Sequence, residues 1–245
     1  MTIFQNDVGN KKVIGQGSFG TVYCGELDGR DKKTKVAVKI FKSLELFKNE
    51  KRILEDLSKS PQIVRCLASS CDPKLLLELA DMNLQQKIAK KDYDNKAASH
   101  FCLEISKGLD YLLNKGYLHR DLKPSNILIF GENAKLTDFG ISVNYSTKSS
   151  SWNEKYSSFE SLENKHCRES DIYSLGVVIL EVFHKKFTSK LGNITQLLLN
   201  DKEDFKDIPV DIWDLVLNCV KYNWEDRIQI SKVTKILENF TKTLK

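Results

Sequence analysis

Short apolar segments with strand character dominate the first third of the chain. Between the segments at 36–40 and 63–67, apolar residues recur at helical spacing over 43–57. This spacing predicts a helix, which Pro61 ends. A glycine-rich turn separates the first two segments, and a polar turn separates the second from the third. Five segments rich in β-branched and apolar residues are predicted to be strands: 13–14, 21–23, 36–40, 63–67 and 75–79.

Helical spacing of apolar residues dominates the chain after Ala80. Two short strand-like segments, 127–129 and 135–137, interrupt it. A strand-rich part followed by a helix-rich part predicts an α+β fold with two lobes that meet near 79–82. Four longer helices are predicted in the second part: 97–113, 170–183, 211–220 and 231–240.

Composition narrows the class of protein. The chain has 245 residues, 41% of them hydrophobic, and its 38 basic and 33 acidic side chains leave a formal net charge of +5. An ordinary apolar fraction with a small net charge predicts a folded domain. So mild a positive charge indicates neither a nucleic-acid partner nor a membrane surface.

Targeting segments and cysteine spacing narrow the class of protein further. The first eight residues lack the basic and apolar regions of a secretory signal, and the longest apolar stretch, 175–183, is too short to cross a bilayer. The six cysteines form no C-x-x-C pair, which favours free thiols in a reducing cytoplasm or nucleus.

A glycine-rich stretch, GQGSFGTV, occupies residues 15–22. A dinucleotide-binding turn needs a helix after its glycines, whereas here the pattern predicts a strand. Glycines without side chains let backbone N–H groups approach phosphate oxygens. Taken alone, however, the stretch is better interpreted as an ordinary hairpin turn.

Lys39 lies on the predicted strand 36–40, between apolar residues expected to face the core. A single lysine on a strand is usually a solvated edge residue. It becomes a phosphate ligand when a carboxylate holds it in place, and Glu50 on the following helix is the candidate.

Two further motifs follow in order, HRDLKPSN at 119–126 and DFG at 138–140. Together with the glycine-rich stretch and Lys39, they resemble the catalytic domain of eukaryotic-type protein kinases over essentially all 245 residues. The resemblance implies one kinase domain, 1–245. Its N-lobe, 1–80, would be a small antiparallel sheet with one main helix, and its C-lobe, 81–245, would be larger and mostly helical.

The resemblance implies ATP and Mg²⁺ as cofactors. Lys39 would bind the α- and β-phosphates and pair with Glu50, while Asp138 and Asn126 would hold the metal. The hairpin would cover the phosphates with Gly15, Gln16, Gly17, Ser18, Phe19 and Gly20. Adenine would lie between Val22 and Ala37 above and Leu128 below, beside a hinge formed by Leu77, Glu78, Leu79 and Ala80, with Leu77 as the gatekeeper.

The resemblance also assigns the transfer step. Asp121 would accept the proton of the substrate hydroxyl, and Lys123 would neutralise charge on the transferring phosphoryl group. Asp171 would anchor the catalytic loop, and Glu160 would pair with Arg227. Four residues would form the hydrophobic column of an active kinase: Leu54, Cys66, His119 and Phe139.

Two departures from the family pattern lie in the segment expected to bind the protein substrate. Ser158 and Phe159 stand where the family has alanine and proline before Glu160, and losing the proline frees the backbone at that position. Asn153 stands where a threonine usually bridges the catalytic aspartate and lysine. An amide can both donate and accept a hydrogen bond, so it can take that place.

The substrate class follows from Lys123 and Pro124, which are typical of serine/threonine kinases, so protein substrates with serine or threonine hydroxyls are expected. The end of the glycine-rich stretch leans towards the tyrosine-kinase-like group. The alternatives are dual specificity, a small-molecule kinase, and a pseudokinase that acts as a scaffold or allosteric partner. The oligomeric state stays open.

Control by phosphorylation is a further expectation. In kinases that carry an arginine before the catalytic aspartate, as Arg120 is here, this side chain is unpaired until a phosphate arrives. Hydroxyl side chains are dense between Asp138 and Glu160, and the phosphate acceptors are expected among them: Ser146, Thr147, Ser149, Ser150, Ser151, Ser157 and Ser158.

Overall fold

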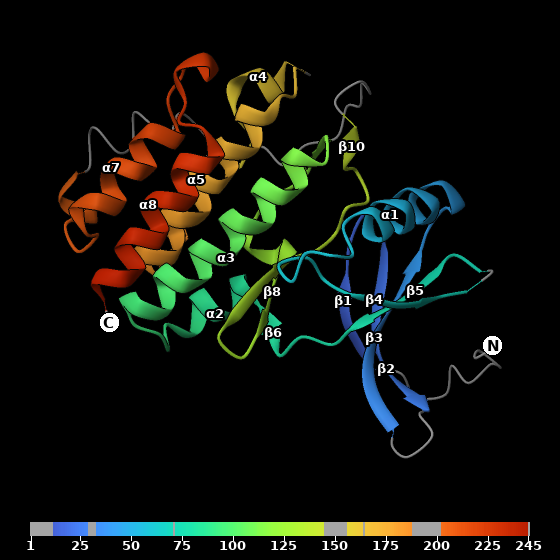
Figure 1. Ribbon diagram of the computed structural model, residues 1–245. Helices are drawn as coiled ribbons and strands as arrows, with labels where there is room; N and C mark the ends of the chain where they lie inside the picture. The colour runs from blue at the N-terminus through green and yellow to red at the C-terminus, as the bar shows by residue number, and fades with distance from the viewer. Residues whose placement is uncertain are drawn as a thin grey trace.

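An antiparallel five-stranded sheet with one helix adjoins a mostly helical C-terminal region (Figure 1). The predicted α+β fold is confirmed by this arrangement. The structure, a computed structural model, describes residues 12–28, 33–70, 72–144, 156–163, 165–187 and 202–244.

The N-terminal sheet has the order β1-β2-β3-β5-β4, and all its neighbouring strands are antiparallel. Side chains alternate across β3, so Val36 and Val38 form a small apolar cluster with Leu76 on one face, while Ala37 faces the main core on the other. Lys39, two residues on, shares the face of Ala37. The five strands are β1 (Val13–Gln16), β2 (Gly20–Asp28), β3 (Lys33–Phe41), β4 (Cys66–Ser69) and β5 (Lys74–Glu78).

Helix α1 (Leu44–Asp56) begins at Ser43, whose hydroxyl accepts a hydrogen bond from Leu46 N. Its buried residues recur at helical spacing, so one face packs inward. The helix ends at Asp56, before Pro61. The buried residues of α1 are Phe47, Glu50, Ile53 and Leu54.

The strand predicted at 63–67 is wrong in its first half. Val64 N donates to Leu136 O at 2.9 Å, and Ile63 bridges Leu136 as well, so both residues pair with the C-terminal region. Strand β4 of the N-terminal sheet begins at Cys66, and the residue before it, Arg65, is the first to bond to β5, through Glu78 N. Apolar composition predicted extended backbone here but not which strand it would meet.

The C-terminal region is built around α3 (Asn95–Asn114), which packs against α5 (Arg168–His184), α8 (Ile230–Thr243) and strand β9 (Asn133–Leu136) (Figure 1). Helix α7 (Val210–Cys219) packs on α5. The four predicted helices are thus present. Helix α5 is buried along most of its length because it lies between its neighbours. Within the described ranges, no helix is long and apolar enough to cross a membrane.

Several short elements complete this region. Helix α2 (Leu84–Lys90) was not predicted, although Asn83 and Gln86 form a capping box at its start. The predicted strands near 127 and 135 are the β8–β9 hairpin. The remaining elements are β6 (Met82–Asn83), β7 (Tyr117–Leu118), η1 (Pro124–Asn126), β8 (Ile127–Phe130), β10 (Val143–Asn144), α4 (Phe159–Leu162), η2 (Lys202–Phe205) and η3 (Trp224–Asp226).

Candidate active site

Lys39 joins the two halves of the molecule. Its Nζ atom lies 2.8 and 2.6 Å from the two carboxylate oxygens of Glu50, and 2.7 Å from Asp138 Oδ1. Strand β3 supplies the lysine, α1 supplies Glu50, and Asp138 follows β9. The sequence prediction paired Lys39 with Glu50, and the structure places them in contact.

Burial and charge act against each other in this cluster. Burial lowers the pKa of Lys39, but the charges of Glu50 and Asp138 outweigh it and leave the pKa above its ordinary value. Burial raises the pKa of Asp138, but the charge of Lys39 outweighs it and leaves the pKa below its usual range. Burial also raises the pKa of Glu50, against the opposing charge of Lys39. Lys39 is therefore a cation at neutral pH and Asp138 a carboxylate.

The loop before β8 brings three predicted residues together. Lys123 Nζ lies 2.8 and 2.6 Å from the carboxylate oxygens of Asp121, and Asn126 Nδ2 donates to Asp121 Oδ2 at 2.8 Å. Asn126 Nδ2 also donates to the carbonyl oxygen of Asp121 at 2.9 Å. Pro124 begins the single turn η1, where its fixed backbone angle suits the first position. The carboxylate of Asp121 is thereby held by two neighbours.

Asn126 and Asp138 offer oxygen atoms suited to a magnesium ion. The amide nitrogen of Asn126 points at Asp121, which leaves its Oδ1 for a cation. Thr137 N donates to Asn126 O at 3.1 Å, so the residue before Asp138 lies beside Asn126. Magnesium prefers such hard oxygens, with one or two carboxylates and substrate phosphates. Across the described ranges, no group of three His, Cys, Asp or Glu side chains is placed to hold a metal by itself. The residues present fit Mg²⁺ bound together with phosphate.

The glycines of the turn between β1 and β2 differ in the space that a side chain would have at each position. Gly17 N donates to Gly20 O at 3.0 Å and closes the turn. A Cβ on Gly20 would lie 2.2 Å from Ile40 O, so this glycine is needed for close contact with β3, whereas Gly17 faces open space. A Cβ on Gly140 would lie 3.2 Å from the Phe19 ring, which places the tip of the turn against the residues that follow Asp138. Gln16 and Ser18 are exposed.

The predicted adenine-binding residues share one apolar cluster, which contains Val22, Ala37, Leu77, Leu79 and Leu128. These residues come from β2, β3, the end of β5 and β8, so both lobes contribute to the cluster.

The backbone N–H of Glu78, one of the hinge groups expected to read adenine, is already in use. Its N–H donates to Arg65 O at 3.1 Å, and its carboxylate accepts from Lys135 Nζ at 2.6 Å and from Arg65 N at 2.8 Å. Since Arg65, the residue before β4, already accepts this N–H, Glu78 cannot donate it to a base. The donor expected for adenine therefore falls to Leu79 or Ala80.

The protein kinase domain family matches residues 8–237 of this chain. The chain belongs to the protein kinase family. It is 29% identical to the tyrosine-protein kinase SYK of Gallus gallus over 93% of its length and 41% of that relative's. It is 33% identical to an Aurora kinase of Debaryomyces hansenii over 95% of its length and 61% of that relative's. A probable serine/threonine-protein kinase of Dictyostelium discoideum is 28% identical over 97% of this chain but only 18% of its own length. The chain thus spans less than two thirds of each of these relatives.

The four residues expected to form the hydrophobic column of a kinase are buried or partly buried: Leu54, Cys66, His119 and Phe139. The rings of His119 and Phe139 lie 5.3 Å apart, and neither side chain is exposed. Leu54 and Phe139 belong to the main core, and Cys66 packs against it.

Asp171, at the start of α5, accepts hydrogen bonds from His119 N at 2.7 Å and from Arg120 N at 2.9 Å. It thereby holds the backbone that precedes Asp121, in which Arg120 has a φ of +69°.

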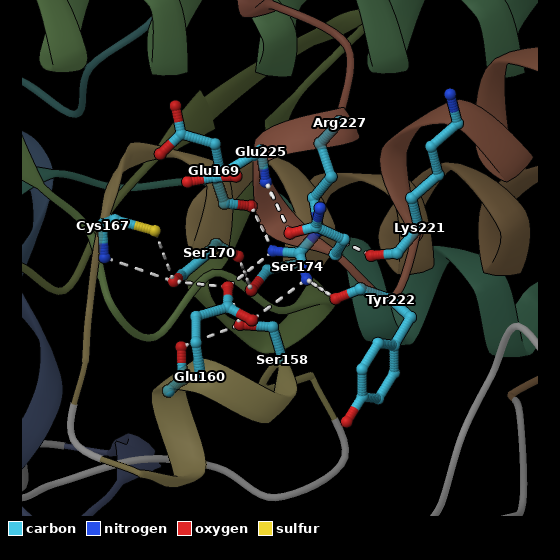
Figure 2. Close-up of polar contacts among 12 residues, drawn as sticks. Ser158, Glu160, Cys167, Glu169, Ser170, Ser174, Lys221, Tyr222, Glu225 and Arg227 are labelled. Atoms are coloured by element: carbon cyan, nitrogen blue, oxygen red, sulfur yellow. Dashed lines mark hydrogen bonds and ion pairs between the residues drawn. The ribbon is translucent and has the colours of Figure 1, made fainter.

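The ion pair expected between Glu160 and Arg227 is buried and bidentate, with N–O distances of 2.6 and 3.0 Å (Figure 2). Two serines that the sequence prediction had not placed there also reach it. Ser158 Oγ donates to Glu160 Oε1 at 2.5 Å, and Ser170 Oγ donates to the same atom at 2.9 Å. The departure at Ser158 therefore adds a hydrogen bond to the ion pair. This ion pair joins α4 to the segment between η3 and α8.

Replacing Ser158 by alanine is expected to lower the free energy of unfolding by about 1.5–3 kcal/mol, the range for a hydrogen bond to a charged group. Urea unfolding measures the change, with the exposed Ser58→Ala as a control that should stay within about 0.5 kcal/mol. Equal stability of the two variants would contradict a role for Ser158 in supporting Glu160.

One expectation about phosphorylation changes. Ser158 is fully buried, so it is removed from the expected phosphate acceptors. Arg120 is buried and is not without a partner in this structure, and its pairing with a phosphate stays a prediction. Other residues named in the sequence analysis lie outside the described residues: Asn153, Ser146, Thr147, Ser149, Ser150 and Ser151.

Proposed function

We propose that this chain is an ATP- and Mg²⁺-dependent protein kinase that phosphorylates serine and threonine hydroxyls of protein substrates. The convergence of Lys39, Glu50 and Asp138 beside the Asp121–Lys123–Asn126 cluster is the observation that carries the proposal. Residues 1–245 would act as one catalytic domain with lobes at 1–80 and 81–245.

In this proposal each residue has a physical task. Lys39, kept cationic by Glu50 and Asp138, holds the α- and β-phosphates. Asp121 takes the proton of the substrate hydroxyl. At the same time the hydroxyl oxygen forms a bond to the γ-phosphorus, and the bond between the γ-phosphorus and ADP breaks. Lys123 neutralises charge on the transferred group. Asn126 and Asp138 would hold Mg²⁺, which when bound neutralises charge on the phosphate oxygens.

Serine/threonine specificity rests on Lys123 and Pro124 in the catalytic loop. The relatives include enzymes named as serine/threonine kinases and others named as tyrosine kinases, so peptide specificity requires a direct test. Radiolabelled ATP with arrays of serine, threonine and tyrosine peptides separates the possibilities. Label on tyrosine peptides alone would refute the proposed substrate class.

A pseudokinase that serves as a scaffold is the second candidate, because Ser158 and Phe159 depart from the family pattern. Ser158 supports the Glu160–Arg227 ion pair, so the departure at this position is compatible with that ion pair. The presence of Lys39, Asp121, Asn126 and Asp138 favours catalysis.

Mg²⁺ and ATP together are expected to raise the melting temperature. At 100 times the dissociation constant, binding to the native state stabilises it by about 2.7 kcal/mol, or about 5–10 °C for a chain of this size. Differential scanning fluorimetry with and without EDTA measures the shift. Lys39→Met should shrink it, and no shift in the wild-type protein would leave the kinase proposal without its first requirement.

A further inference from the structure

Asn49, the residue before Glu50 on α1, contacts the backbone that follows Asp138. Its Nδ2 atom donates to Ser142 O at 2.9 Å and lies 3.4 Å from both Phe139 O and Gly140 O. Its Oδ1 accepts from Arg52 Nη2 at 3.3 Å. The amide nitrogen thus faces three carbonyl oxygens and the amide oxygen faces a donor, so each end of the amide meets its complement.

The segment that Asn49 contacts is itself attached to the catalytic loop. Ser142 Oγ donates to His119 O at 3.0 Å. The next two residues form β10, which pairs with β7 so that Val143 lies opposite Leu118. Because this segment is tied to the backbone that leads into Asp121, a helix bound to it takes its position from the catalytic loop.

A second set of contacts links α1 to the C-terminal region one turn further on. Arg52 Nη1 donates to the Tyr117 hydroxyl at 3.2 Å, and this hydroxyl donates to Asp56. Tyr117 belongs to β7, the partner of β10. Arg52 therefore contacts Asn49 and β7 at once, which restrains the amide from the side opposite the carbonyl oxygens.

We propose that Asn49 is a positioning residue for phosphoryl transfer: by tying α1 to residues 139–142, it holds Glu50 against Lys39. This inference rests on the proposed kinase function. Glu50 follows Asn49 directly, and Lys39 lies within 2.8 Å of both Glu50 and Asp138. A shift of the helix by an ångström or so would lengthen the Lys39–Glu50 contact and leave Lys39 attracted to Asp138 alone.

The first test replaces Asn49 by aspartate, which keeps the shape of the side chain but turns the donor into an oxygen facing three carbonyl oxygens. We expect KM for Mg–ATP to rise and kcat to fall, with kcat/KM for ATP reduced about tenfold or more and KM for the peptide unchanged. Lys48→Gln on the neighbouring exposed residue makes the same change in net charge and should stay within about twofold of wild type.

A second measurement separates this inference from the proposed function. Hydrogen exchange of α1 and of 139–144 should be faster in Asn49→Asp than in wild type and unchanged in Lys48→Gln. If the wild-type protein transfers no phosphate, the kinase proposal fails and the exchange rates alone decide the role of Asn49. Should Asn49→Asp fail to fold, Asn49→Ala serves for the same measurements. Unchanged exchange in α1, or unchanged kinetics for ATP in an active enzyme, would overturn the inference.

Discussion

Asp121→Asn is expected to lower kcat by about 10²–10⁴-fold, the usual contribution of a positioned base, while the affinity for Mg–ATP stays close to wild type. The substituted amide has nearly the same shape but cannot take the proton of a substrate hydroxyl. Asp121 contacts Lys123 and Asn126, whereas Lys39 and Asp138 form the cluster proposed to meet the nucleotide. Single-turnover kinetics and nucleotide titration measure the two quantities separately.

Two controls make this experiment specific. Asp214→Asn makes the same chemical change at an exposed position on α7 and should leave kcat within about twofold of wild type. Lys39→Met should weaken nucleotide binding as well as turnover, because the phosphates lose a cation. Wild-type turnover by Asp121→Asn would show that another group, or none, accepts the proton.

Arg227→Met is expected to lower the free energy of unfolding by about 3–5 kcal/mol, because it leaves Glu160 buried without its charge partner. Burial raises the pKa of Glu160, but the hydrogen bonds from Arg227 and Ser158 outweigh it and hold the pKa below the usual range. Arg227 also donates to the carbonyl oxygens of Lys221, at 2.9 Å, and of Glu169, at 2.9 Å, and methionine cannot replace these bonds (Figure 2). Urea unfolding at neutral pH measures the loss.

The double variant Arg227→Met, Glu160→Gln removes both charges and should recover part of the stability, which a double-mutant cycle quantifies. Lys165→Met disrupts an ion pair with Glu163 whose two side chains are mostly exposed, and it should change stability by less than about 1 kcal/mol. A loss below 1 kcal/mol for Arg227→Met would mean that the buried ion pair contributes no more than a surface pair.

Local chemistry accounts for what could be predicted from the sequence alone. The β-branched run around Lys39 forms β3, and the helical spacing after it forms α1. Glu50 could be chosen from its neighbours because it shares a helical face with Phe47 and Leu54. Such patterns depend on residues a few positions apart, which is why strands, helices and short motifs were visible without the fold.

Other contacts could not be predicted from the sequence, although the residues that make them had been identified there. The N–H of Glu78 was among the groups expected to read adenine, but Arg65, the residue before β4, accepts its hydrogen bond, and the register of β4 on β5 depends on residues distant in the chain. Ile63 has a strand composition, yet it meets Leu136 of β9. Composition describes the backbone preference of a segment and does not specify its partner.

The sequence by itself determined the family motifs, the predicted chemistry and most of the regular elements, because each depends on residue type and short spacing. Only the tertiary structure brought Ser158 to the buried Glu160 and placed Asn49 against the carbonyl oxygens that follow Asp138. Asn49 belongs to no motif of the predicted site, and Ser158 was noted only as a departure from the family pattern and as an expected phosphate acceptor. Both act on groups held in place by distant parts of the chain. Hydrogen bonds of this kind depend on the packing of α1, α4 and α5 against their neighbours, which no local pattern specifies.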